Sequence, residues 1–174
     1  MPKYIENDKE IPKYYINKRY HGCDNPVPKC KRCFSLLFNL RRLLKKYKNK
    51  VVLVYFPTIK QQEQFAKKIK YEYLINSLSD NREELLRKIK ELENGAVLTT
   101  TVLERGITIP SIDIVLIKYH KHIFDKASMI QMIGRVGRSF EDPEGEAIIL
   151  TNHYDKEVIE TRKEIIKANE MPVL

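Results

Sequence analysis

The sequence predicts an α/β fold in which a doubly wound parallel sheet carries helices on both faces. Short apolar runs rich in β-branched and aromatic residues, such as residues 51–56, indicate strands that are buried on both sides, as in parallel sheets. Amphipathic stretches lie between these runs. Strands that alternate with helices require crossover connections, which cover both faces of a sheet. The 174 residues suffice for one such domain with a hydrophobic core.

The first predicted helix covers residues 33–48, where leucines recur at three- and four-residue spacing and arginines and lysines fill the other face. A buried strand follows at residues 51–56. The remaining elements are expected, in order, as a helix at 61–70, a weak strand at 73–75, a helix after Asp80, strands at 96–101 and 112–117, a helix at 127–133, a strand at 147–150 and a last helix that ends before Pro172.

The helix after Asp80 carries signals at both ends. Asp80, with Glu83 at the third helical position, has the pattern of a capping box. Gly95 is expected to close the helix because glycine accepts the left-handed conformation of a helix end. On the outer face, Glu84 and Lys88 lie four residues apart and are expected to form an ion pair.

Residues 1–32 are predicted to be a basic, proline-containing lead-in from a preceding domain, and residues 33–174 to be the folded domain. Prolines scattered through the lead-in exclude a long helix there. Residues 1–50 contain 14 Lys and Arg but only 4 Asp and Glu, whereas residues 51–174 contain 18 and 19. The excess positive charge therefore lies in the first third of the chain. It indicates either a nucleic-acid contact or a solvated, flexible segment.

Three cysteines, Cys23, Cys30 and Cys33, follow His21 within a short stretch. Cys30 and Cys33 have the two-residue gap of a zinc-ligand pair. Only one residue separates His21 from Cys23, however, and such pairs are usually two to four residues apart. Reduced thiols of a cytoplasmic protein are therefore the favoured interpretation, with zinc as the alternative. No apolar run reaches roughly 18 residues, so membrane insertion is not expected.

Residues 131–138 read Gln-Met-Ile-Gly-Arg-Val-Gly-Arg and are the strongest candidate for chemistry. The planar, permanently charged guanidinium groups of Arg135 and Arg138 are suited to binding a terminal phosphate. Gly134 and Gly137 beside them let the backbone approach a ligand or a facing domain. The alternative is a helix end with two solvated arginines.

Threonines follow two of the predicted strands. Thr58 comes after the strand at 51–56, and Thr100 and Thr101 come at the end of the strand at 96–101. Because ligands gather at the carboxyl ends of parallel strands, we expect these hydroxyl groups and the arginines to lie along one rim of the sheet. Threonine hydroxyls and backbone amides can bind nucleic-acid phosphates, although β-propensity alone also explains threonines in strands.

The chain contains only six glycines and no Gly-x-x-x-x-Gly-Lys-Ser/Thr loop for a nucleotide's phosphates. If the arginines contact a nucleotide, another domain must present it.

Residues 51–58, 99–110 and 131–138 resemble, in order, motifs IV, V and VI of superfamily-two helicases, and the likeness to the second RecA-like domain of that family covers about residues 33–170. The segment Glu-Arg-Gly-Ile-Thr-Ile-Pro at 104–110, together with Tyr-His-Gly at 20–22 and Pro-Val-Pro at 26–28, is most similar to ComFA-type competence translocases, which are ATP-driven motors of DNA uptake.

The resemblance implies a RecA-like fold and a motor in which an N-terminal RecA-like domain binds most of the ATP and Mg²⁺. Arg138 would be the finger on the γ-phosphate and Arg135 its companion, while Gln131 would order the γ-phosphate or the attacking water. Phosphoryl transfer depends mainly on such positioning and charge stabilisation. Gly134 and Gly137 would let this loop approach the nucleotide.

The family also implies that Thr58, Thr100 and Thr101 hold the nucleic-acid backbone, and that Gly106 and Thr108 couple the two sites. Two residues depart from the family pattern. Met132 stands where many relatives have arginine, and Thr108 stands where the DEAD-box branch has aspartate, which weakens an RNA-specific assignment.

The expected partners are single-stranded DNA, the N-terminal RecA-like domain and membrane-associated DNA-uptake machinery, in the cytoplasm at the inner face of the membrane. The full-length protein is expected to be an ATP-dependent DNA helicase or translocase, and this chain alone to be inactive. Two alternatives are a non-catalytic nucleic-acid-binding module with a basic, zinc-binding N-terminal segment, and a RecA-like domain reused as a protein-interaction scaffold.

Overall fold

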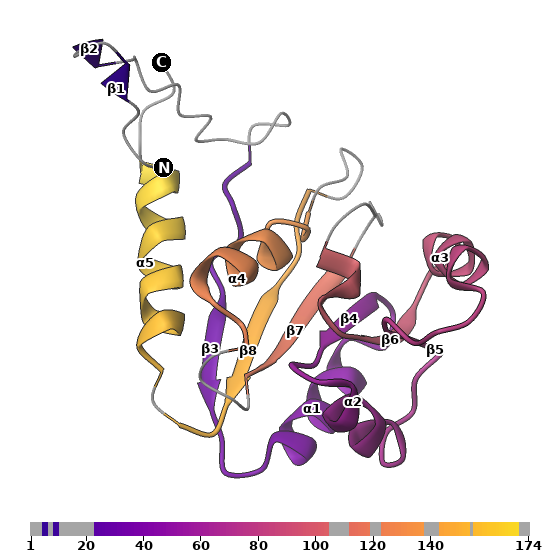
Figure 1. Ribbon diagram of the computed structural model, residues 1–174. Helices are drawn as coiled ribbons and strands as arrows, with labels where there is room; N and C mark the ends of the chain where they lie inside the picture. Colours follow the sequence, from indigo (N-terminus) through magenta and orange to yellow (C-terminus); the bar gives the residue numbers. More distant parts are fainter. Residues whose placement is uncertain are drawn as a thin grey trace.

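The computed structural model describes residues 5–6, 9–10, 23–104, 112–118, 123–137, 143–153 and 155–170. A six-stranded sheet organises this part of the chain (Figure 1). Its strands are β3 (Lys29–Arg32), β4 (Val51–Tyr55), β5 (Tyr73–Ile75), β6 (Gly95–Thr99), β7 (Ile112–Lys118) and β8 (Ala147–Thr151). They lie in the order β3-β8-β7-β4-β6-β5, and every neighbouring pair is parallel. The two-residue strands β1 (Ile5–Glu6) and β2 (Lys9–Glu10) form a separate antiparallel pair.

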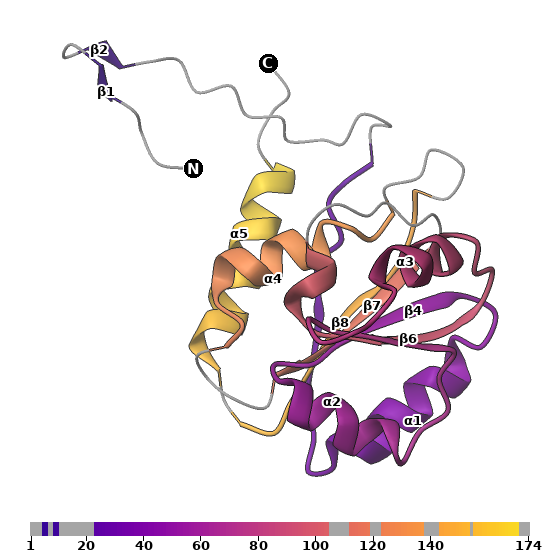
Figure 2. The same ribbon diagram turned by 45° about the vertical axis from the view of Figure 1, so that its right-hand side comes forward.

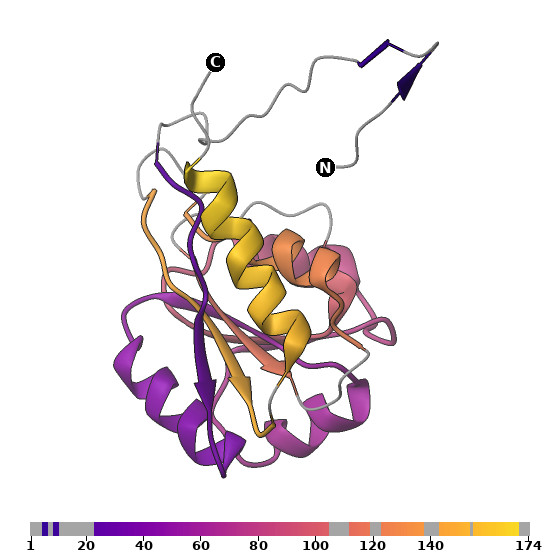
Figure 3. The same cartoon turned by 90° about the vertical axis from the view of Figure 1, so that its left-hand side faces the viewer.

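Helices cover both faces of the sheet, as predicted. They are α1 (Leu36–Lys46), α2 (Ile59–Ala66), α3 (Arg82–Lys90), the 3₁₀ helix η1 (Thr101–Glu104), α4 (Lys126–Ile133) and α5 (Lys156–Glu170). In Figure 2, α1 and α2 lie on one side of the sheet, and α3, η1 and α4 lie on the other. Figure 3 shows α5 beside α4, against the end of the sheet formed by β3 and β8. None of the helices in the described ranges is long and apolar enough to cross a membrane.

The sheet is buried on both faces because the central strands are mostly apolar. Along β4, Leu53 and Tyr55 contribute to the core beneath α4, whereas Val52 and Val54 contribute to the core above α1. Each of these side chains is at most 1% exposed. A continuous apolar run is therefore the sequence pattern of this strand, in place of the alternation that a half-exposed strand would show.

The chain reverses its direction along the sheet at β5, and at the same point its connecting helices pass from one face of the sheet to the other. From β3 to β4 and β5, the chain moves along the sheet in one direction with α1 and α2 on one face. From β5 through β6, β7 and β8, it moves in the other direction with α3, η1 and α4 on the opposite face. A single handedness of crossover connections requires this correlation, so the sheet is doubly wound as predicted.

Strand β3 was not predicted, because the expected lead-in included residues 29–32. All four of its residues are exposed, and its sequence Lys-Cys-Lys-Arg has no apolar periodicity. Backbone pairing with β8 holds it, and the Cys33 amide continues the pairing by donating to the Thr151 carbonyl at 2.8 Å. Charged residues of this kind are common on edge strands, where they oppose pairing with a further chain.

The ends of α3 also differ from the prediction. The N-cap is Asn81, in the left-handed conformation with φ of 52° and no side-chain capping bond, so the expected capping box at Asp80 is absent. Gly95 is the first residue of β6 and not the helix terminator. Its φ of +120° and the close approach of the Glu72 carboxylate explain the glycine. The expected ion pair between Glu84 and Lys88 is present, at 2.6 Å.

Candidate functional site

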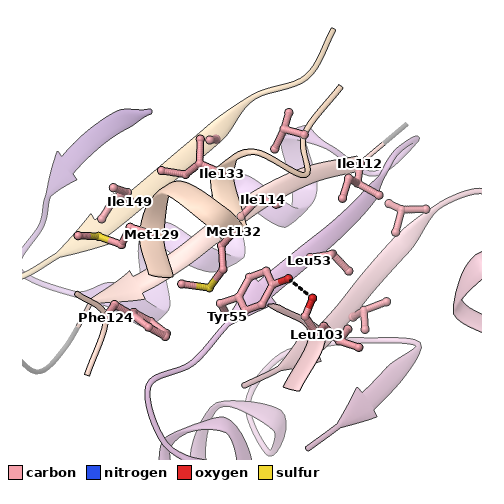
Figure 4. Close-up of a cluster of buried hydrophobic side chains, with 14 of the residues drawn as sticks. Leu53, Tyr55, Leu103, Ile112, Ile114, Phe124, Met129, Met132, Ile133 and Ile149 are labelled. Atoms are coloured by element: carbon pink, nitrogen blue, oxygen red, sulfur yellow. Dashed lines mark hydrogen bonds between the residues drawn. The ribbon is translucent and has the colours of Figure 1, made fainter. Parts of the chain in front are cut away.

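The three helicase-like segments share one hydrophobic core centred on Tyr55. Tyr55 is the last residue of β4 and is fully buried, and its hydroxyl group donates to the Leu103 carbonyl of η1 at 3.2 Å. Met132 of α4 belongs to the same core (Figure 4). The segments at 51–58, 99–104 and 131–137 are thus joined by packing. A displacement of one is expected to be transmitted to the others because packed interiors deform little.

The threonines lie at the carboxyl ends of two neighbouring strands. Tyr55 of β4 is the register partner of Thr99 of β6, and the Phe56 amide donates to the Thr99 carbonyl at 2.8 Å. Thr58 comes shortly after the end of β4, and Thr100 comes directly after the end of β6. The prediction that these threonines share one edge of the sheet is therefore confirmed.

Each threonine has a different environment at this edge. Thr58 is the N-cap of α2, and its side-chain oxygen accepts from the Gln61 amide at 3.2 Å. Thr100 is 7% exposed, whereas Thr101 is exposed at the start of η1. The edge therefore combines a helix N-terminus with the exposed Thr101, a combination that can contact phosphate without reading bases.

A buried polar network that the sequence analysis missed supports this edge. Gln62 is fully buried, and its Nε2 atom donates to the Ile75 carbonyl at 3.1 Å and to the Leu98 carbonyl at 2.8 Å. Asn76 Nδ2 donates to Gln62 Oε1 at 2.9 Å. The network fixes α2 to the ends of β5 and β6. Its only sequence signal was a glutamine on the inward side of a predicted helix.

The glycines of the arginine-containing segment are explained by the backbone. Gly134 is the C-cap of α4, and a Cβ atom there would lie 3.1 Å from the Ile130 carbonyl oxygen. Gly137 has a φ of +62°, the left-handed region that favours glycine. Between them, the amides of Arg135 and Val136 donate to the Met132 and Ile133 carbonyls, each at 3.1 Å. The backbone around Arg135 is therefore held in a defined turn.

The arginine-containing segment does not lie on the threonine edge, so that expectation was wrong. The Val136 side chain packs against Gly145. A Cβ atom added to Gly145 would clash with Val136 and would lie 2.9 Å from the Ile112 carbonyl oxygen, so the three residues are close together. Ile112 and Gly145 are at the amino ends of β7 and β8. The reason is that α4 returns antiparallel to the strands, so its last turn lies at the opposite end of the sheet from Thr58.

Side chains on α4 divide into buried and accessible ones. Gln131 is exposed and Arg135 is partly buried. Met132 is fully buried in the core with Tyr55. The position at which many relatives carry arginine is therefore a packing position in this chain.

Several predicted residues lie outside the described part of the structure: Gly106, Thr108, Arg138 and His21. The candidate zinc set is thus only partly described. Among the residues that the structure describes, no group of three or more His, Cys, Asp or Glu side chains is placed to hold a metal ion. Burial raises the pKa of the Cys33 thiol.

The fold and the order of its motif segments define a C-terminal RecA-like domain of a superfamily-two helicase. The chain belongs to the helicase conserved C-terminal domain family, whose model matches residues 35–140.

Two curated relatives are named competence protein ComFA. The protein from Streptococcus pneumoniae is 27% identical over 92% of this chain and 41% of its own length, and that from Bacillus subtilis is 28% identical over 56% of this chain and 21% of its own length. A DNA 3'-5' translocase, XPB2 of Sulfurisphaera tokodaii, is 25% identical over 67% of this chain and 26% of its own length. The chain therefore spans less than half the length of these relatives.

Solved structures share the fold at lower identity. The C-terminal domain of the DEAD-box protein Dbp5 superposes with a TM-score of 0.59 at 20% identity, covering 83% of this chain and 85% of that one. Saccharomyces cerevisiae Dbp5 bound to RNA and ADP BeF3 gives 0.59 at 19% identity, over 87% of this chain and 40% of that one. The RecA-like parallel sheet is confirmed by these matches.

Proposed function

We propose that this domain is the second half of an ATP-dependent DNA translocase of the ComFA type. In this proposal Arg135 and Arg138 act as arginine fingers on ATP that an N-terminal RecA-like domain holds, and the threonine edge binds the DNA backbone. The observation that carries the proposal is the shared core of Tyr55, Leu103 and Met132, which joins both surfaces in one packed unit.

The residues of this chain fit half of a nucleotide site. The sequence has no phosphate-binding loop, so ATP and Mg²⁺ would be held mainly by the other domain. The turn at Arg135 is fixed by backbone hydrogen bonds and by the positive φ of Gly137. A fixed backbone at this residue limits the positions that the guanidinium group can reach, which supports preorganised charge stabilisation.

Each functional side chain has a separate task in this scheme. Arg135 and Arg138 bind phosphate oxygens, and the exposed Gln131 orients the γ-phosphate or the attacking water. An arginine finger accelerates phosphoryl transfer by roughly three to five orders of magnitude. ATP hydrolysis supplies the free energy for closing and opening the cleft between the two domains.

Movement along DNA would follow from the separation of the two surfaces. The threonine edge and the arginine turn lie at opposite ends of the sheet, and α4, η1 and β4 connect them through one core. Closure onto ATP would therefore shift the DNA contacts as a rigid unit. The similarity to two competence proteins and a DNA translocase supports DNA as the substrate and a role in DNA uptake. We place the protein in the cytoplasm, at the inner face of the membrane, on the same grounds.

The test is the DNA-stimulated ATPase rate of a protein that contains this chain together with its N-terminal RecA-like domain. Arg135→Ala and Arg138→Ala are each expected to lower kcat by at least about a thousandfold with little change in DNA affinity. Arg87→Ala, on the exposed side of α3, is the matched control. The chain alone is expected to show no turnover. Unchanged kcat in both arginine variants would exclude the finger role and favour the non-catalytic module or the scaffold.

A further inference from the structure

A groove of about 1010 Å³ lies on the face of the domain away from α4, between α1 and residues 68–72. Leu44, Val52, Ile69 and Ala96 contribute its apolar floor. Basic residues stand along both walls: Arg41, Arg42, Lys45 and Lys48 from α1 and the turn after it, and Lys68 and Lys70 from the segment after α2.

The charge of this groove is not compensated within the described residues. Five exposed basic residues of the groove form no ion pair with any described residue: Arg42, Lys45, Lys48, Lys68 and Lys70. Among the described residues that line the groove, Glu72 alone is acidic, and its carboxylate accepts from the Ala96 amide at 2.5 Å. A concentration of unpaired cations of this kind attracts polyanions strongly at low salt.

The two walls of the groove are held together. Arg41 Nε and Nη2 donate to the Lys68 carbonyl at 3.1 and 2.6 Å, which links α1 to the opposite wall. Phe38, which lines the same groove from α1, is 65% exposed. An exposed aromatic ring beside unpaired cations is the arrangement on which single-stranded nucleic acids stack their bases.

We propose that this groove is a second binding site for single-stranded nucleic acid, outside the motor interface. Arg42, Lys45 and Lys68 bind phosphates, and Phe38 stacks against a base. The site lies on the α1 face, whereas α4 and its arginine turn lie on the opposite face of the sheet. It would keep a strand attached to the domain while the threonine edge releases and rebinds. As in the proposed function, the ligand is a single strand of nucleic acid, but the residues of the groove differ from those of the threonine edge.

The experiment measures binding of a fluorescein-labelled oligothymidylate of about 20 nucleotides to the 174-residue chain at several salt concentrations. The groove variant combines Arg42→Gln, Lys45→Gln and Lys68→Gln. The matched control removes the same charge from α3 and α5 by Lys90→Gln, Lys163→Gln and Lys167→Gln, all at exposed positions. Thermal unfolding of both variants verifies that they fold.

The groove variant is expected to bind at least about tenfold more weakly, with the salt slope of log K reduced by roughly 2, because each lost phosphate contact removes about 0.7. The control is expected to bind within about twofold of the unmodified chain, since uncontacted charges act only through screened long-range attraction. Phe38→Ala is expected to weaken binding about tenfold without changing the salt slope.

Equal affinities for the groove and control variants would overturn the proposal. A second result would also overturn it: the groove variant loses affinity for a polyglutamate peptide but binds oligothymidylate as tightly as the unmodified chain does. The occupant of the groove would then be an acidic protein segment. Thr58→Ala separates this site from the threonine edge. If only Thr58→Ala weakens binding, the groove proposal fails. If only the groove variant does, the threonine edge of the proposed function fails.

Discussion

Glu146 is expected to make the stability of this domain depend on pH below about 4.5. Its carboxylate lies just before β8 and accepts a hydrogen bond from the Tyr47 hydroxyl group, and it forms ion pairs with Lys29 at 2.9 Å and Lys46 at 3.6 Å. It therefore joins the edge strand β3 and the end of α1 to β8. The Tyr47 hydrogen bond and the Lys29 contacts lower the pKa of Glu146 from 4.5 to about 2.

The sign of the effect follows from proton binding. The unfolded chain binds a proton at Glu146 at a higher pH than the folded one does, so the group stabilises the fold above 4.5 and loses this contribution as the pH falls towards about 2. A shift of this size corresponds to a ceiling of roughly 3 kcal/mol. The side chain is 33% exposed, so solvent screening reduces the expected contribution to about 1–2 kcal/mol.

Urea unfolding between pH 5 and about pH 2 measures this contribution. Glu146→Gln is expected to lower the free energy of unfolding at neutral pH by about 1–2 kcal/mol and to flatten its decline below pH 4.5. Glu144→Gln, an exposed neighbour, is the control and should leave both unchanged. Parallel pH profiles for Glu146→Gln and the unmodified chain would refute the assignment.

Three further substitutions test the packing of the site. Gln62→Leu should cost about 2–3 kcal/mol in urea unfolding, because two carbonyls and an amide lose a buried partner, whereas Gln64→Leu at an exposed position of α2 should stay within about 0.5 kcal/mol. Gly137→Ala should lower the unfolding free energy by about 1–2 kcal/mol because its φ is +62°, and an unchanged midpoint would contradict that backbone conformation. Met132→Arg introduces the residue common among relatives and should lower the free energy of unfolding by more than about 3 kcal/mol in thermal unfolding, since the Met132 side chain is fully buried. A stable variant would show that the side chain at this position can turn outward.

Much of the fold could be predicted because its local signals agree with its packing. The apolar run at β4, the leucine spacing of α1 and the alternation of strands and helices specify a doubly wound parallel sheet before any contact is known. The glycines at 134 and 137 were expected to let the backbone approach a ligand, and that stays a prediction; the structure adds that Gly137 has a positive φ. These features depend on neighbours in the sequence, which a single chain displays directly.

Other features depended on contacts between distant segments. The strand β3 has no apolar periodicity because it pairs with β8 through its backbone and its side chains are exposed, so the sequence carried no signal of it. The prediction placed the arginine turn on the threonine rim because ligands favour carboxyl strand ends, yet the antiparallel return of α4 puts it at the amino ends. The burial of Met132 likewise depends on which side of α4 meets Tyr55.

The sequence by itself determined the fold class, the order of the helicase segments and the presence of residue types that are suited to binding phosphate. Only the tertiary structure decided that these segments share the core at Tyr55, that the threonine edge and the arginine turn lie at opposite ends of the sheet, and that lysines from α1 and residues 68–70 face one groove. The physical reason is that hydrophobic periodicity reports how much of a segment is buried, whereas the identity of its partner is set by long-range packing.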